Sequence, residues 1–125
     1  MAKIVTVLFT IGAVAVLSAA KKEPTECYHC SLIDGTRCND PDLSKITKQS
    51  CSDIPTNKNT TSDVVCYTVT ATWLGHPITE RGCYYTEMEG EDVCSYFYRT
   101  EANVPFTYDY TCKLCYDDLC NDKPR

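Results

Sequence analysis

Ten cysteines, spread from Cys27 to Cys120, constrain the fold of this 125-residue chain more than any other feature. Beyond residue 20 about one residue in ten is a cysteine, which is the composition of a disulfide scaffold. Apolar runs such as Val64-Val65 and Tyr84-Tyr85 are short and bury little area. Ordering a residue costs roughly 1.5 kcal/mol in a small chain, whereas each disulfide contributes about 2–4 kcal/mol. We therefore expect the bridges to be the main support of the fold.

The first 20 residues are predicted to be a cleaved secretory signal peptide. Lys3 precedes an almost unbroken apolar run from Ile4 to Leu17, and Ser18-Ala19-Ala20 supplies small residues for cleavage. Such a run is too short for a membrane span. We expect residues 21–125 to form one secreted domain with its core between residues 27 and 121, and no transmembrane segment. Export brings the cysteines into an oxidising compartment, where they pair.

The charge of the chain argues against nucleic acid as a partner. Twelve Lys and Arg residues against seventeen Asp and Glu give a formal net charge of −5, and the chain has no basic run. Phosphate contacts need clustered Lys and Arg. Together with the predicted export, this leaves a small extracellular module as the expected class.

The second half of the chain has the pattern of β-hairpins. Residues from Cys66 to Trp73 alternate with period two and are rich in β-branched types, and Leu74-Gly75-His76-Pro77 is a turn signal before the pattern resumes at Ile78. This predicts a hairpin from Cys66 to about Cys83.

A further hairpin is predicted from Cys94 to Cys112. Its arms are Tyr96–Tyr98 and Phe106–Tyr110, with the tip near residues 101–105. The segment from Cys27 to Cys51 is less regular, and only residues 43–49 hint at helical periodicity. The predicted class is all-β.

Two stretches are predicted to be loops. Residues 52–63 are polar and contain Asn59-Thr60-Thr61, an N-glycosylation sequon. We expect Asn59 to carry a glycan because the chain is predicted to be exported. Residues 87–92 form an acidic turn that we expect on a solvated face.

The cysteine spacing permits other chemistry, and it leaves the connectivity open. Cys27-x-x-Cys30 and Cys112-x-x-Cys115 resemble the halves of a zinc site, but reduced thiolates are not expected outside the cell. A redox pair needs a helix N-terminus to lower the thiol pKa, and neither pair has that context. We expect structural disulfides, with no metal and no cofactor.

Catalysis is not expected. A nucleophile needs a base beside it, which is usually a histidine held by a carboxylate, and the chain has only His29 and His76. His29 lies between cysteines, and His76 lies at a predicted hairpin tip. Asp117-Asp118 is expected to anchor a loop.

Laid out along the chain, the cysteines and their neighbours resemble the three-finger superfamily, and specifically its lymphocyte-antigen-six/urokinase-receptor domains. The resemblance spans Cys27 to Asn121, and the sequence is similar to invertebrate members such as quiver and sleepless. It rests on the opening Cys27-Tyr28-His29-Cys30, on Arg81-Gly82-Cys83, and on the terminal Cys115-Tyr116-Asp117-Asp118-Leu119-Cys120-Asn121.

The resemblance implies three hairpin fingers that radiate from a knot of five bridges, at about residues 27–51, 66–83 and 94–112. It also implies that Asn121 hydrogen-bonds back across the base of the fold. The implied pairs are Cys27–Cys66, Cys30–Cys38, Cys51–Cys83, Cys94–Cys112 and Cys115–Cys120.

The sequence departs from the family pattern in two respects. Many members have adjacent cysteines where this chain has Cys112-Lys113-Leu114-Cys115. Many members also carry a signal for a lipid anchor, which needs an apolar C-terminal tail. This chain ends five residues after Cys120, so we expect a soluble secreted protein, with an anchor only if the C-terminus has been trimmed.

The resemblance implies a binding module and not an enzyme. The first hypothesis is a ligand or modulator of a membrane receptor or ion-channel ectodomain, of the nicotinic-receptor or potassium-channel type, and we expect it to be monomeric in solution. The alternative hypothesis is an adhesive or epithelial-junction component that acts through protein–protein contacts. The expected partner contacts lie at the second fingertip, where aromatic anchors concentrate interface energy; they are Trp73, Leu74, His76 and Pro77.

Overall fold

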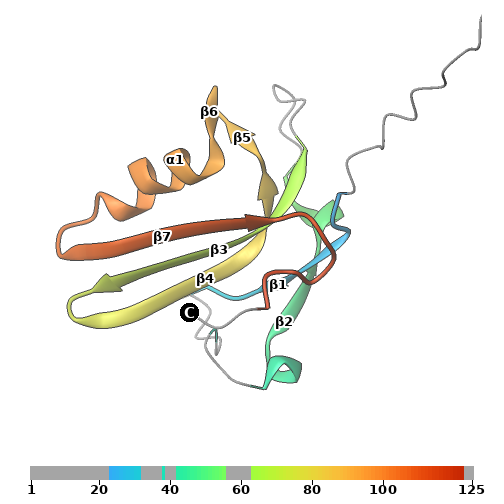
Figure 1. Ribbon diagram of the computed structural model, residues 1–125, viewed down its shortest axis with the longest axis horizontal. Coiled ribbons are helices and arrows are strands. Elements are labelled where there is room, and N and C mark those ends of the chain that lie inside the picture. Colours follow the sequence, from blue (N-terminus) through green and yellow to red (C-terminus); the bar gives the residue numbers. More distant parts are fainter. Residues whose placement is uncertain (1–22, 32–37, 39–41, 56–62, 123–125) are drawn as a thin grey trace, which may run out of the picture.

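The computed structural model describes residues 23–31, 38, 42–55 and 63–122 of the chain. In this part of the chain, seven strands form three antiparallel sheets (Figure 1). The strands are β1 (Glu26–His29), β2 (Thr47–Ser50), β3 (Val64–Trp73), β4 (His76–Tyr85), β5 (Glu87–Met88), β6 (Glu91–Asp92) and β7 (Thr107–Cys115). The fold is disulfide-rich and mainly β, which confirms the predicted class.

β3 and β4 form the second finger, over the residues that the alternating pattern indicates. The pairs run from Val64 opposite Tyr85 to Trp73 opposite His76. Leu74 and Gly75 close the hairpin, with φ angles of 50° and 77°. Positive φ at both central residues is typical of the tight turn whose twist matches that of the flanking strands. The hairpin is therefore closed by two residues only.

β7 completes a three-stranded sheet in the order β4-β3-β7. It pairs with β3 from Cys66 opposite Cys115 to Trp73 opposite Thr107, and the register shifts between Thr70 and Thr72. Such a bulge bends one strand and increases its twist. The central position of β3 buries much of that strand, and the outer end of β7 lies beside the second fingertip.

The third finger differs from its prediction. The arm expected to be a strand at Tyr96–Tyr98 is helical, with α1 at Val93–Phe97 followed by one π-helical turn, η3, at Tyr98–Ala102. The carboxylate of Asp92 caps α1, because it accepts hydrogen bonds from the Ser95 backbone N–H (3.0 Å) and hydroxyl (2.6 Å). The strand β7 takes its partner from β3 and not from this arm, so the predicted second hairpin is wrong in its first half.

Packing against the sheet explains the helix. Val93 and Phe97 are one helical turn apart, so they share a face, and both are buried. The Phe97 ring lies 4.8 Å from the ring of Tyr67 and 5.2 Å from that of Tyr84, measured between centroids. Figure 1 shows α1 beside the β4-β3-β7 sheet. Phe97, in the middle of the aromatic run Tyr96–Tyr98, thus belongs to a helix whose buried face packs on β3 and β4.

The first finger is short. β1 and β2 pair from Glu26 opposite Ser50 to His29 opposite Thr47. The hint of helical periodicity at residues 43–49 corresponds only to a single 3₁₀ turn, η1 (Leu43–Lys45), after which β2 begins. A further 3₁₀ turn, η2 (Cys51–Asp53), follows β2.

The predicted acidic turn is a miniature hairpin of β5 and β6. Arg99 of η3 forms ion pairs with Glu89 (3.0 Å) and Glu91 (2.7 Å). These groups are largely exposed, so the pairs contribute little to stability. They nevertheless fix where the basic side chain of η3 points.

Candidate functional site

All ten cysteines are bridged. The bridges are Cys27–Cys66, Cys30–Cys38, Cys51–Cys83, Cys94–Cys112 and Cys115–Cys120, the same five pairs that the resemblance implies. They join the bases of the fingers into one knot.

The pairing bears on the zinc and redox hypotheses. Cys27 and Cys30 belong to different bridges, as do Cys112 and Cys115, so neither Cys-x-x-Cys pair forms a disulfide of its own. Within the described residues, two groups of three sulfur atoms lie close enough to share a metal ion. All six cysteines are bridged and lack the thiolate that a metal ligand needs.

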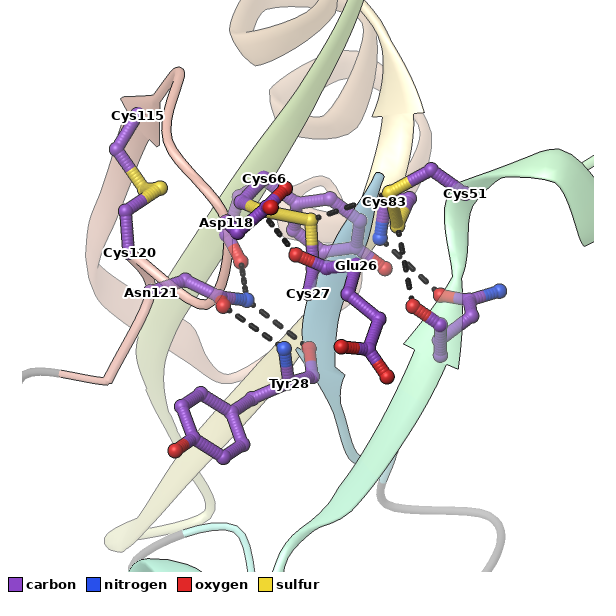
Figure 2. Close-up of a disulfide and its surroundings, with 12 residues drawn as sticks. Glu26, Cys27, Tyr28, Cys51, Cys66, Cys83, Cys115, Asp118, Cys120 and Asn121 are labelled. Carbon is purple, nitrogen blue, oxygen red and sulfur yellow. Dashed lines mark hydrogen bonds between the residues drawn. A yellow bond between two sulfur atoms is a disulfide. The ribbon is translucent and has the colours of Figure 1, made fainter. Parts of the chain in front are cut away.

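Asn121 locks the C-terminal loop across the knot. Its side-chain oxygen accepts a hydrogen bond from the Tyr28 backbone N–H at 2.9 Å. Its amide nitrogen donates to the carbonyls of Tyr28 (2.9 Å) and Tyr67 (3.1 Å). Figure 2 shows the Asn121 amide facing the Tyr28 backbone, next to the Cys115–Cys120 bridge. Asn121 is buried, so the role that the resemblance implied for it has a clear geometric basis.

Arg81 is a buried cation whose role the sequence did not reveal. Its side chain is 2% exposed, and it donates to the carbonyls of Asn121 (2.5 Å) and Cys38 (3.3 Å). Burial lowers the pKa of the Arg81 guanidinium, and the nearby charge of Asp122 opposes that shift. The next residue is Gly82, where an added Cβ would lie 3.1 Å from the Tyr67 hydroxyl. In the Arg-Gly-Cys motif, the buried Arg81 therefore holds two other segments by hydrogen bonds, and Gly82 leaves room for the Tyr67 side chain to lie close to the backbone.

The predicted contact residues lie where the sequence placed them. Trp73 ends β3 and is 42% exposed, and Leu74 in the turn is 52% exposed. His76 and Pro77 begin β4 and are also exposed. The described turn thus presents two large apolar side chains and no Lys or Arg to solvent.

The tip of the third finger extends this surface. The Leu74 backbone N–H donates to the Phe106 carbonyl at 3.2 Å, and Phe106 is 74% exposed. Val104 and Tyr108 are exposed beside it. The tyrosine-rich third finger, with Tyr108, was a candidate extension of the second fingertip on the sequence alone; the β3–β7 register, which pairs Thr72 with Tyr108 and Trp73 with Thr107, brings the two tips together. We call Trp73, Leu74, Val104, Phe106 and Tyr108 the fingertip surface.

A groove of about 500 Å³ lies behind the fingertip surface. One wall is the sheet, with Val69, Ala71 and Ile78, and the other wall is η3 and the residues after it. Trp73 and Val104 belong to both the groove and the fingertip surface. The sequence did not indicate the groove, since η3 was expected to be part of a strand.

The groove contains two carboxylates. The Tyr67 hydroxyl donates to Glu80 Oε1 at 2.9 Å. Glu101 as a whole residue is exposed, yet desolvation by the groove, followed by the charge of Glu80, raises the pKa of the Glu101 carboxyl to about 7. The same surroundings raise the pKa values of the Tyr67 and Tyr110 hydroxyls. The groove thus has an acidic region within apolar walls.

Two predictions lie outside the described residues. These are the signal peptide at residues 1–20 and the glycosylation of Asn59, and both stay predictions. No helix in the described part of the chain is long and apolar enough to cross a membrane.

Comparison with known proteins places this architecture in a family. No curated protein and no solved structure matches the chain significantly. The family model described as the Quiver family u-PAR/Ly-6-like domain matches residues 25–121. Domains of this kind are commonly small, disulfide-rich binding modules and are generally not enzymes. The match covers the whole knot and all three fingers, and the chain belongs to the Quiver family of u-PAR/Ly-6-like domains.

Proposed function

We propose that the chain is a secreted ligand or modulator of a membrane receptor or ion channel, and that the fingertip surface is its contact. The observation that supports this most is the backbone hydrogen bond from Leu74 to Phe106, which brings exposed apolar residues of two fingers to the same end of the molecule. Contiguous exposed apolar patches mark interaction sites. The nicotinic-receptor or potassium-channel type of partner rests on the resemblance.

The scaffold favours binding energetically. The bridges and the two-residue turn at Leu74-Gly75 restrain the fingers before a partner arrives. Less conformational freedom is then lost on association. Trp73 and Tyr108 are large, partly exposed aromatic side chains, the type that carries much of the binding energy at interfaces.

The chemistry of the fingertip surface indicates the kind of contact. None of its five members is charged, and the chain as a whole is acidic. We therefore expect an apolar, aromatic recognition mode, in which affinity depends only weakly on salt because the contact residues carry no charge for salt to screen. A partner would present an apolar cleft or a rim of aromatic residues.

The proposal is tested by expressing the chain together with a nicotinic acetylcholine receptor or a potassium channel in oocytes and recording currents. We expect the wild-type chain to change current amplitude or kinetics. Phe106→Ala should lose that effect, while Tyr116→Ala should retain it, because Tyr116 is also a large exposed aromatic residue but lies at the knot, after β7. Currents that the wild-type chain leaves unchanged in both channel classes would contradict this partner type.

The second candidate function is an adhesive or junctional component. The same fingertip surface favours it, because an exposed apolar patch can also drive contact between copies of the chain. Analytical ultracentrifugation of the purified protein separates the two functions. A modulator should sediment as a monomer, whereas a junctional component should self-associate, and Phe106→Ala should then abolish the association.

Secretion and glycosylation are part of the proposal and have a direct test. An intact mass of protein from the medium of expressing cells, measured before and after glycan removal, should correspond to a chain starting at Lys21. A shift on glycan removal that Asn59→Gln abolishes would place the glycan at Asn59. Retention of the protein on cells, with no product in the medium, would support the junctional function instead.

A further inference from the structure

The groove behind the fingertip surface has an apolar end and a polar end. Along β3 it runs from Val69 past Ala71 to Trp73, a span of about 13 Å at the usual rise per residue of a strand. Glu80 is paired with Val69 and Ile78 with Ala71, so the carboxylate lies at the inner end. The volume of about 500 Å³ is in the usual range for sites that bind small molecules.

The polar end is rich in acceptors. One oxygen of Glu80 accepts from the Tyr67 hydroxyl, which leaves its second oxygen for another donor. Glu101 also lines the groove, and the charge of Glu80 contributes to the raised pKa of its carboxyl. The Tyr110 hydroxyl is buried and, within the described residues, has no hydrogen-bond partner. A buried polar atom without a partner costs free energy that a bound donor recovers.

The protein does not supply a cation to these acids from η3. Arg99, the basic residue of that turn, pairs with Glu89 and Glu91 of the acidic hairpin instead. Two carboxylates held together in partly desolvated surroundings favour a positively charged ligand. An anionic ligand would be repelled, and a neutral ligand would leave the charges unmatched.

We propose that the groove binds a primary alkylammonium, a compound with one ammonium head and an apolar body. The head would lie among Glu80, Glu101 and the Tyr110 hydroxyl. A primary ammonium has three N–H donors and no acceptor, which suits a site that offers three acceptors. The body would lie along Val69, Ala71 and Ile78 toward Trp73. This site shares Trp73 and Val104 with the fingertip surface, but Leu74 and Phe106 do not line it, so variants of those two residues test the proposed function separately.

The test uses n-octylammonium and 1-octanol as probes of equal chain length. Trp73 is the only tryptophan of the chain and lines the groove, so its fluorescence reports occupancy. We expect saturable binding of octylammonium, about tenfold tighter than that of octanol because of its charge-assisted hydrogen bonds. Glu101→Gln should weaken octylammonium binding about tenfold and leave octanol binding unchanged.

Asp109→Asn is the matched control for Glu101→Gln. It removes the same charge from a residue that does not line the groove, and Asn tolerates the φ of 53° found there. Glu80→Gln is a second groove variant, in case one substitution disturbs folding, and intact disulfides with unchanged circular dichroism verify the fold of each variant. Equal affinity for both probes would overturn the proposal. So would a loss in Asp109→Asn as large as that in Glu101→Gln, or a fluorescence change that does not saturate.

Acidification gives an independent readout. Glu101 is faced by Glu80 and Tyr84 of β4, Tyr67 of β3 and Tyr110 of β7. The pKa values of the three hydroxyls are raised, so they stay neutral near pH 7. Octylammonium binding should therefore weaken as pH falls below about 7 and Glu101 gains its proton. Binding of equal strength on both sides of that pH would contradict the role of Glu101.

Discussion

The backbone N–H of Leu74 donates a hydrogen bond of 3.2 Å to the carbonyl of Phe106, and so joins the tips of the second and third fingers. Both residues have positive φ, 50° and 67°, which L-residues with large side chains seldom adopt. Both side chains are also large, apolar and exposed. Such residues break the local rules of sequence choice, and violations of this kind are expected at functional sites. This relationship is why we place recognition at the fingertip surface.

The first prediction concerns Leu74→Asn. Asn accepts positive φ more readily than Leu, so the free energy of unfolding should rise by up to about 1 kcal/mol. Partner binding should fall, because the exposed apolar side chain is lost. Chemical denaturation and a binding assay on the same preparation measure both effects. A variant that is more stable and still binds as the wild type would show that Leu74 is not a contact.

The second prediction concerns Asn121→Ala. The substitution leaves the Tyr28 N–H and two buried carbonyls without their partner. We expect the free energy of unfolding to fall by about 2–4 kcal/mol, as measured by denaturant titration with the bridges intact. Tyr116→Ala, an exposed change in the same terminal segment, should stay within about 0.5 kcal/mol of the wild type. Equal losses in the two variants would refute the role assigned to Asn121.

The sequence predicted the second finger better than the third, for physical reasons. The strands from Val64 to Tyr85 have alternating β-branched residues and a strong turn, so local preference and tertiary structure agree. At Tyr96–Tyr98 the aromatic residues prefer strands, but the buried Val93–Phe97 face and the Asp92 cap favour a helix. The pair Asp92 and Ser95 was the available signal for a helix start.

The groove and the joined fingertips could not be predicted from the sequence, for a related reason. The groove exists because η3 stands opposite Ala71 and Ile78, and this depends on the helix that the sequence did not predict. The contact of Leu74 with Phe106 depends on the register of β3 and β7, including the bulge near Thr70. Both features arise from pairing between distant segments, which local patterns do not encode.

The third prediction tests the origin of the helix. Asp92→Ala removes the side chain that accepts the Ser95 N–H, and loss of such a cap costs about 1 kcal/mol. Hydrogen exchange should accelerate first at the amides of α1. Asp92→Ser keeps an oxygen in the capping position and should recover most of the loss. Equal destabilisation by Ala and Ser would mean that the carboxylate acts in some way other than capping.

The fourth prediction is a pH dependence of stability. The pKa of Glu101 is raised from 4.5 to about 7, so the folded chain binds a proton more tightly than the unfolded chain between these values. By linkage, the contribution of Glu101 is fully favourable below about pH 4.5 and is lost as pH rises toward about 7. Exposure of the residue to solvent keeps the effect small. Thermal melts of wild type and Glu101→Gln should converge at acidic pH and diverge toward neutral pH, with the variant more stable; parallel curves would contradict the assignment.

The most direct test of the central claim is an equilibrium binding isotherm. Fluorescently labelled chain would be titrated onto cells that express the responsive receptor or channel, with untransfected cells as background. Phe106→Ala and Leu74→Asn touch the fingertip surface without lining the groove, and Tyr116→Ala is the control at the knot. The account predicts that each fingertip variant loses about tenfold or more in affinity, as aromatic and apolar anchors do at interfaces, while Tyr116→Ala binds as the wild type. Fingertip variants with unchanged affinity, or an equal loss in Tyr116→Ala, would contradict it.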